Sequence, residues 1–251
     1  MEPQIQTFTN TGHGFEPSET ISTPRNNGFL ALPAEKDRFF HAASNYVYVF
    51  QRTDGRYQNV EQINTDSHIA RIQFLNGLLV TAHGNGRLRF YQTSDYHLER
   101  TLIAGSSGIN GFSETEDGSL LAAGGIDMHV RVFQFDGSTY SQVQQIYAGF
   151  RVRVVKLSRE RLIFTGQTNK VWIYESNGTQ YLPSQCIQTN ESIIYDMSIS
   201  QGMSRFVFGG DSNTLSIYEL ANGIYELRHQ QPIATEVLEV IVDPDELYLM
   251  V

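Results

Sequence analysis

Two glycine-rich stretches are the places where this chain could hold a phosphate group. Gly124-Gly125 precedes an acidic turn, and Gly84-Asn85-Gly86 begins a G-x-G pattern. A dinucleotide-binding loop needs a third glycine at its sixth position and a helix after it, because backbone N–H groups and the helix N-terminus bind the phosphate. Arg89 stands where that third glycine belongs, and no helical periodicity follows Gly125. We therefore expect no nucleotide site at either place.

Residues that bind metals or act as nucleophiles are present but scattered. The closest two of the seven histidines are 14 residues apart, which is no metal-ligand spacing. Asp243 and Asp245 lack the glycine and glutamate that complete a calcium loop. Cys186 lies in an expected fourth strand, where a structural cysteine is favoured over a nucleophile, and no G-x-S-x-G elbow occurs. The sequence predicts no catalytic residue, no metal and no cofactor.

Charge and composition narrow the range of partners and compartments. The formal net charge is -9, with 18 basic and 27 acidic residues, and no basic block is present. Nucleic-acid binders and proteins held on anionic membranes carry such blocks, so neither partner is expected. A single cysteine, no export signal at the N-terminus and no long apolar run favour a cytoplasmic location, with the nucleus as the alternative.

A repeat of about 42 residues organises most of the chain. Five aromatic residues end similar alternating apolar runs, and the gaps between them are 41, 42, 41 and 44 residues. They are Phe50, Tyr91, Phe133, Tyr174 and Tyr218. Eight residues before them stand Ala42, His83, Gly125, Gly166 and Gly210, four of which are small. We expect the small residues to allow close packing of sheets, and the aromatics to pack between them.

Each repeat unit contains four short alternating segments separated by turn residues. Asp54-Gly55, Asp136-Gly137 and Asn177-Gly178 are typical of tight hairpins, and Asp127 falls in another turn. Four strands in each unit of 40 to 45 residues is the pattern of a propeller blade. The sequence therefore predicts an all-β fold, a β-propeller of four-stranded blades.

Residues 109–134, "INGFSETEDGSLLAAGGIDMHVRVFQ", resemble a WD repeat, with "VRVFQ" where the family has Val-x-Val-Trp-Asp. The other units look like looser copies, and none keeps the Trp-Asp pair. The resemblance implies a degenerate WD-repeat propeller of six or seven blades. In the second blade it implies a remnant of the family's buried hydrogen-bonded set at His68, Thr81, Asn85 and Tyr91.

The expected domain runs from 28 to 251, after a polar N-terminal segment, 1–27. Its expected blades are 28–67, 68–108, 109–151, 152–192, 193–236 and a partial sixth, 237–251. Residues 4–9 could be a strand that closes the ring, with 10–27 as a linker. An open ring leaves sheet edges unpaired. Our first expectation is a fragment of a larger propeller; the alternatives are a partner segment that completes the ring, and a chain unable to fold alone.

The expected function is non-catalytic: a WD-type scaffold that binds other proteins or peptides through loops on one face of the propeller. The resemblance places this face at the start of each first strand and at the second-to-third-strand turns. The corresponding residues are Arg71, Asn110, Arg153, Tyr195, Gln167 and Asp211. The alternative is a lactonase-like hydrolase, in which distant acidic and histidine side chains hold a metal in the central channel.

Overall fold

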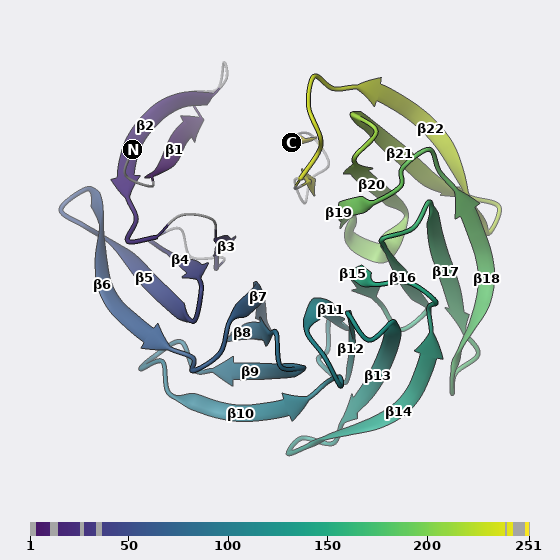
Figure 1. Cartoon of the computed structure of the whole chain (residues 1–251), viewed down its shortest axis with the longest axis horizontal. Coiled ribbons are helices and arrows are strands. Elements are labelled where there is room, and N and C mark those ends of the chain that lie inside the picture. Colours follow the sequence, from purple (N-terminus) through teal and green to yellow (C-terminus); the bar gives the residue numbers. More distant parts are fainter. Residues whose placement is uncertain are drawn as a thin grey trace. The chain divides into compact units, whose positions relative to one another are not determined.

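The computed structural model describes residues 4–10, 15–25, 28–33, 37–238, 240–242 and 249–250, and these residues form an all-β protein. Within them lie five four-stranded antiparallel sheets and two two-stranded hairpins (Figure 1). The one helical segment among them is the 3-10 turn η1, Gln201–Met203. The chain divides into two compact units, Met1–Thr101 and Leu102–Val251. The expectation of an all-β fold is confirmed.

The first unit contains one hairpin and two sheets, each in chain order. The hairpin consists of β1 (Gln4–Asn10) and β2 (Phe15–Ser22). The first sheet consists of β3 (Phe29–Ala31), β4 (Arg38–Ala43), β5 (Tyr46–Thr53) and β6 (Arg56–Asn64). The second consists of β7 (Ile69–Leu75), β8 (Leu78–His83), β9 (Arg87–Tyr91) and β10 (Leu98–Ile103).

The second unit contains three sheets and a short hairpin. The first sheet consists of β11 (Ile109–Glu114), β12 (Leu120–Gly125), β13 (His129–Phe135) and β14 (Tyr140–Tyr147). The second consists of β15 (Val152–Leu157), β16 (Arg161–Gly166), β17 (Lys170–Ser176) and β18 (Tyr181–Gln188). The third consists of β19 (Ile194–Ile199), β20 (Arg205–Gly210), β21 (Thr214–Ala221) and β22 (Ile224–Pro232). The hairpin joins β23 (Ile241–Val242) to β24 (Leu249–Met250). Each sheet is a simple meander.

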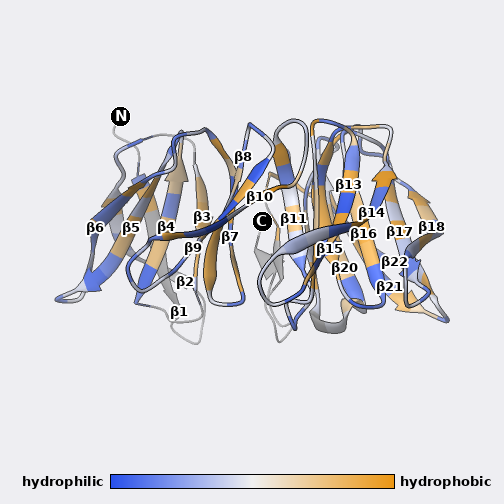
Figure 2. Cartoon of the chain, turned by 90° about the horizontal axis from the view of Figure 1, so that it is seen from below, coloured by the Kyte–Doolittle hydropathy of each residue, from blue (hydrophilic) through white to orange (hydrophobic). Residues whose placement is uncertain are grey.

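Tight turns explain why consecutive strands pair. Asp54-Gly55 and Asn222-Gly223 have positive φ angles of 51° and 82°, and of 51° and 85°. Asn, Asp and Gly adopt such angles most readily, and two-residue turns of this kind match the twist of a hairpin. The strands between the turns alternate apolar and polar residues (Figure 2). The turn chemistry and the alternation therefore specify the same meander.

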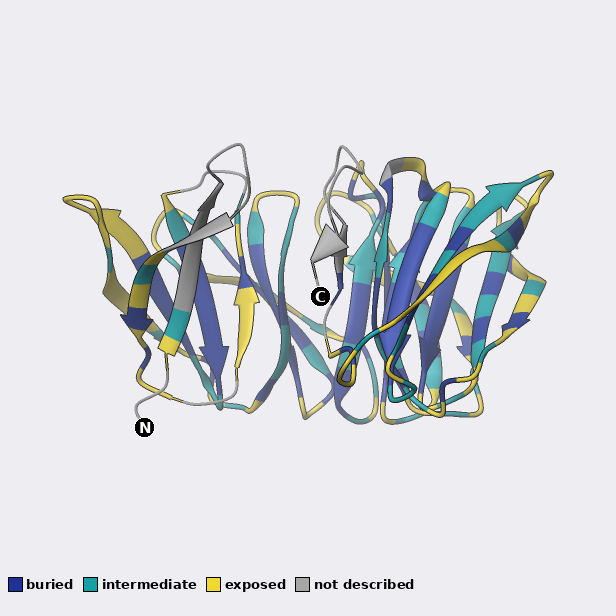
Figure 3. Ribbon diagram, turned by 90° about the horizontal axis from the view of Figure 1, so that it is seen from above, coloured by how far each residue is buried: buried dark blue, intermediate teal, exposed yellow. Residues whose placement is uncertain are grey.

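The core lies between successive sheets. In the second unit, Val130 and Val132 of β13 pack with Val155 and Phe164 of the next sheet. That sheet packs in turn on the one after it, through residues such as Ile173 and Phe206. The outer, fourth strands are largely exposed (Figure 3). A four-stranded sheet with two apolar faces needs a neighbour on each side, and stacking supplies it.

A hydrogen-bonded clamp joins neighbouring fourth strands. The Gln144 amide of β14 donates to the backbone O of Tyr181 at 2.7 Å and accepts from the Tyr181 N–H at 2.9 Å. Gln185 makes the same pair of bonds to Tyr225, both at 2.8 Å. In the first unit, the Glu19 carboxylate of β2 accepts the N–H of Tyr57, at 3.1 and 3.3 Å. The contact recurs at equivalent places.

The β1–β2 hairpin has the register of the third and fourth strands of a sheet. A bulge shifts the pairing between Val132 and Phe133 in β13, and an identical shift occurs between Thr7 and Phe8 in β1. Phe8 stands 42 residues before Phe50, one repeat length away. Bulges of this kind are defined features of a strand pair, so the match is structural evidence of repetition.

The expectation that 10–27 form a polar linker is wrong, because β2 occupies Phe15–Ser22. Its Ile21 packs against Phe39, Tyr48 and Phe50 of the first sheet. The linker prediction relied on polar composition, but one face of β2 supplies enough apolar contact to hold a strand. The closing of a ring by residues 4–9 stays a prediction.

Residues from Val237 onward continue the stacking in the second unit. The N–H of Val237 donates to Gly210 O at 3.1 Å, and that of Val240 to an oxygen of Asp196 at 3.1 Å. Val237 and Val240 also pack on Val207 of β20. The hairpin β23–β24 follows, while Asp243 and Asp245 lie outside the described residues.

The glycines at the repeat positions leave room for a loop of their own sheet and not for a neighbouring sheet. A Cβ on Gly125 would lie 1.9 Å from the backbone O of Gly108, in the loop that leads into the same sheet. Gly210 has the same relation to Ile193 O, also at 1.9 Å. The neighbouring sheet instead meets the preceding residue, where a Cβ on Gly124 would lie 2.6 Å from Val152. The sequence prediction for Gly125, Gly166 and Gly210 therefore named the wrong contact.

Candidate binding site

The first strands of all three sheets in the second unit carry a bulge at their second residue. The pairing shifts between Ile109 and Gly111, between Val152 and Val154, and between Ile194 and Asp196. The extra residues are Asn110, Arg153 and Tyr195. A bulged residue is left out of the ladder, and bulges often re-aim a side chain beside a functional site. Three predicted contact residues thus share one structural position.

These three residues form a row across adjacent sheets. The Asn110 side-chain N–H donates to Val152 O at 3.3 Å, which ties it to the next sheet. The Arg153 guanidinium lies over the Tyr195 ring, 5.1 Å from its centre. All three side chains are half-buried. We call Asn110, Arg153 and Tyr195 the bulge row. It offers an amide, a cation and an aromatic ring along one line.

Arg71 does not occupy the equivalent position. In β7 the bulge falls between Ile69 and Arg71, so the extra residue is Ala70, and Arg71 pairs with Ala82 in the ladder. The structural equivalents of Arg71 are Gly111, Val154 and Asp196. Arg71 is the second residue after Ile69, whereas the other three predicted residues directly follow Ile109, Val152 and Ile194. Arg71 belongs to the first unit, and the bulge row to the second.

Gln167 and Asp211 lie in second-to-third-strand turns, as the sequence predicted for that face. Gln167 is exposed, and its N–H donates to Arg151 O at 3.0 Å. Asp211 accepts the N–H groups of Ser192 at 2.8 Å and Ile193 at 3.1 Å. Burial alone would raise the pKa of Asp211, but these backbone donors lower it. Asp211 is therefore committed to holding a loop, whereas the Gln167 side chain is exposed.

The repeat positions lie in the packed interior to different degrees. Phe50, Tyr91, Phe133 and Tyr218 are buried, and Tyr174 is half-buried. Asp127 accepts the N–H and hydroxyl of Ser106 at 2.9 and 3.0 Å and pairs with Arg131 at 2.8 Å. Burial would raise the pKa of Asp127, yet these bonds lower it. The Asp127 carboxylate fastens a turn to the incoming loop.

A buried polar pair in the second sheet includes His83 and not His68. The His83 ring lies 2.7 Å from the Thr81 hydroxyl through Nε2 and 3.2 Å from Ser67 O through Nδ1. Burial, followed by the charge of Arg89, lowers the pKa of His83 to about 4. His68 and Asn85 are exposed, so that part of the resemblance does not hold. His83 is a neutral structural residue at physiological pH.

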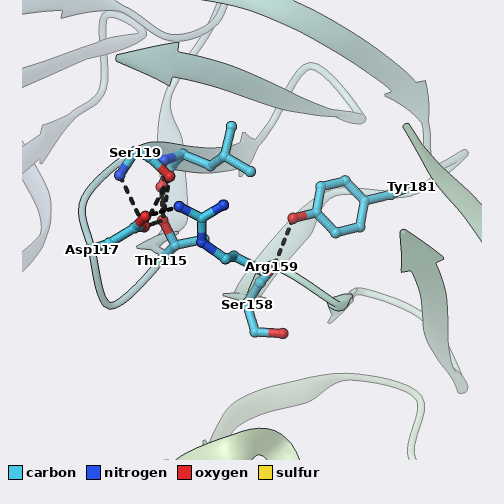
Figure 4. Close-up of polar contacts among 7 residues, drawn as sticks. Thr115, Asp117, Ser119, Ser158, Arg159 and Tyr181 are labelled. Atoms are coloured by element: carbon cyan, nitrogen blue, oxygen red, sulfur yellow. Dashed lines mark hydrogen bonds and ion pairs between the residues drawn. The ribbon is translucent and has the colours of Figure 1, made fainter. Parts of the chain in front are cut away.

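A cavity of about 640 Å³, which the sequence did not predict, lies at the opposite ends of the first strands. It is bounded by the first-to-second-strand turns of three consecutive sheets. Figure 4 shows part of its rim, where the Asp117 carboxylate faces Thr115, Ser119 and Arg159. Asp117 and Arg159 are 42 residues apart, so the repeat length was the signal that could have paired them.

Side chains of metal-ligating types are spread over the described residues without forming a cluster. No group of three or more His, Cys, Asp or Glu side chains among them could hold a metal ion. Cys186 is exposed. In the same part of the chain no helix has the length and apolarity to cross a membrane. The bulge row and the cavity offer hydrogen bonds, charged groups and an aromatic ring.

Comparison with known proteins adds no family to this description. No protein-family model matches the chain, and no curated protein matches it.

Proposed function

We propose that this chain is a WD-repeat-like propeller that binds other proteins or peptides through the bulge row and the turns beside it. Gln167, whose exposed side chain lies in one of these turns, extends the surface. The proposal includes no catalytic step. A rigid set of sheets with chemically varied positions at one end is a common basis for recognition.

Repetition in register supports the propeller. Five sheets share one strand order, and four of them share the bulge in the first strand. The β1–β2 hairpin has the register of third and fourth strands, and the chain from Val237 has the stacking contacts of a first strand. These features favour propeller blades. They also support the hypothesis that residues 4–9 pair with a last sheet as a closing strand.

The bulge row is the observation that carries the binding function. Its residues make no ladder pair at the bulge, so the fold demands no particular side chain there. Arginine and tyrosine are nevertheless found side by side in contact, and both are over-represented at the energetic centre of protein interfaces. A half-buried cation and ring lose little entropy when a partner covers them.

Quantitative affinity purification with two matched variants tests the proposal. Arg153→Ala and Tyr195→Ala should each lose the specific partners of the wild-type chain. Arg56→Ala should keep them, because Arg56 is exposed on β6 and belongs to no proposed binding site. Equal recovery of the same partners by all four proteins, with unchanged thermal melts, would contradict the proposal.

A further inference from the structure

We propose that the cavity at the first-to-second-strand turns of the second unit binds a peptide through one basic side chain flanked by apolar residues. We call this cavity, centred on Asp117, Arg159 and Met203, the turn cavity. Its volume of about 640 Å³ is in the range that accommodates small ligands. It lies at the other end of the strands from the bulge row, so this site is separate from the proposed function.

The charge of the lining favours a cationic occupant. Four carboxylates and one guanidinium line the turn cavity: Glu114, Glu116, Asp117, Glu160 and Arg159. Charged partners are selected by complementary potential, since juxtaposed like charges are unfavourable. A lysine or arginine side chain therefore fits this lining, and an anionic one is opposed by it.

Asp117 is a built receptor for a cation. The hydroxyls of Thr115 and Ser119 donate to its Oδ1 at 2.6 and 2.8 Å, and the Ser119 N–H donates at 3.2 Å. These bonds keep the pKa of Asp117 well below its usual range, with Thr115 as the largest cause. None of these three bonds depends on Arg159, so the carboxylate stays fixed and charged if Arg159 moves.

Arg159 of the same chain already places a cation on the Asp117 carboxylate. Its guanidinium pairs with the other carboxylate oxygen of Asp117 (Figure 4). The Arg159 side chain is 64% exposed, and exposed ion pairs contribute little stability because solvent competes for both charges. Arg159 is thus an internal occupant that a peptide cation can replace at small cost.

Apolar residues beside the carboxylates give the site a second component. Leu157 and Met203 are largely buried and Ile199 is half-buried, and all three line the same cavity. Methionine packs adaptably against varied apolar partners. A basic side chain next to a leucine-like residue would satisfy both parts of the lining, which a free metal ion or a simple amine would not.

Titration of the isotope-labelled full chain with a blocked peptide, Ala-Leu-Arg-Leu-Ala, tests the proposal by NMR. We expect the amide signals of Thr115, Ser158 and Ser200 to shift, with a Kd of about 1 mM or tighter. The same peptide with neutral citrulline in place of arginine should bind at least about fivefold more weakly. Equal binding of the two peptides, or no shifts, would overturn the proposal.

Two variants should change the affinity for the arginine peptide in opposite directions. Asp117→Asn should weaken the arginine peptide about fivefold or more, because it removes the receptor charge. Arg159→Ala should strengthen it, because it removes the internal competitor. If Arg159→Ala instead abolishes binding and an acidic peptide binds better, the cavity is an anion site and the proposal is wrong. Arg153→Ala, at the bulge row, should leave this titration unchanged, so each proposal can fail independently.

Discussion

Glu191 accepts two hydrogen bonds from Ser212, from its N–H at 2.7 Å and from its hydroxyl at 2.5 Å. Glu191 lies in the loop before β19, and Ser212 lies in the turn after β20. Two sheets earlier the partners are exchanged: Ser106 lies in the loop and Asp127 in the turn. In both sheets a serine–carboxylate pair joins the loop before the first strand to the second-to-third-strand turn. The carboxylate is in the loop in one sheet and in the turn in the other.

Glu191 makes the free energy of unfolding fall as the pH rises above 4.5. Burial raises the pKa of the Glu191 carboxyl, so its folded-state pKa lies above its unfolded one. Such a group stabilises fully below the unfolded pKa, and this contribution is lost as pH rises through the folded pKa. Glu191→Gln should therefore gain stability relative to wild type as pH increases from 4.5 to 8. Urea unfolding at several pH values measures this, and a constant difference would contradict it.

His83 makes the free energy of unfolding fall as the pH decreases. Its pKa of about 4 in the folded state lies below the ordinary value of 6.5. The unfolded chain binds the proton first, so stability falls as pH drops from 6.5 toward 4, by up to about 3 kcal/mol. His83→Gln should remove most of this acid sensitivity. The exposed His229→Gln is the control and should keep it; identical acid profiles for the two variants would refute the assignment.

The contact between Arg153 and Tyr195 should be measurable without a partner. The guanidinium lies 5.1 Å from the ring centre, and partly exposed cation–π pairs contribute about 0.5–1 kcal/mol. A double-mutant cycle of Arg153→Ala and Tyr195→Ala, followed by urea unfolding, should give a coupling energy of that size. Strict additivity of the two single variants would show that the residues do not interact.

Gly125 should tolerate no side chain. A Cβ there would lie 1.9 Å from Gly108 O, so Gly125→Ala must displace the loop and should cost about 2–3 kcal/mol. Gly84→Ala is the control, because a Cβ there would lie 4.0 Å from its nearest neighbour, His68 O. Thermal or urea unfolding compares the two. Equal stability of both variants would mean that the loop yields without resistance.

The Gln144 clamp should contribute through two bonds at once. Gln144→Ala leaves the backbone N–H and O of Tyr181 without this partner and should cost about 1–2 kcal/mol. Its neighbour Gln145 is exposed on the same strand, so Gln145→Ala should change stability little. Urea unfolding of both variants measures the difference. A loss at Gln145 as large as that at Gln144 would assign the effect to the strand and not to the clamp.

The alternation of apolar residues and the turn dipeptides were sufficient to predict the strands of the five four-stranded sheets, because both are local properties of the chain. The bulges were not predictable in this way, since an unpaired residue such as Ala70 is defined only by the partner strand. Arg71 was chosen one residue too late, because the prediction counted two residues from Ile69 and not one. The turn cavity was missed because Asp117 and Arg159 meet across two sheets. The β2 strand was missed because its apolar face is short.

The side chains of the bulge row take no part in strand pairing. At 110, 153 and 195 the chain carries one residue more than the ladder uses, and each such residue stands in a different sheet. Replacing these side chains alters no strand pairing, so the three positions can be randomised together as a combinatorial library. The fold then becomes a display framework, in which binders can be selected from three varied positions while the strand register stays constant.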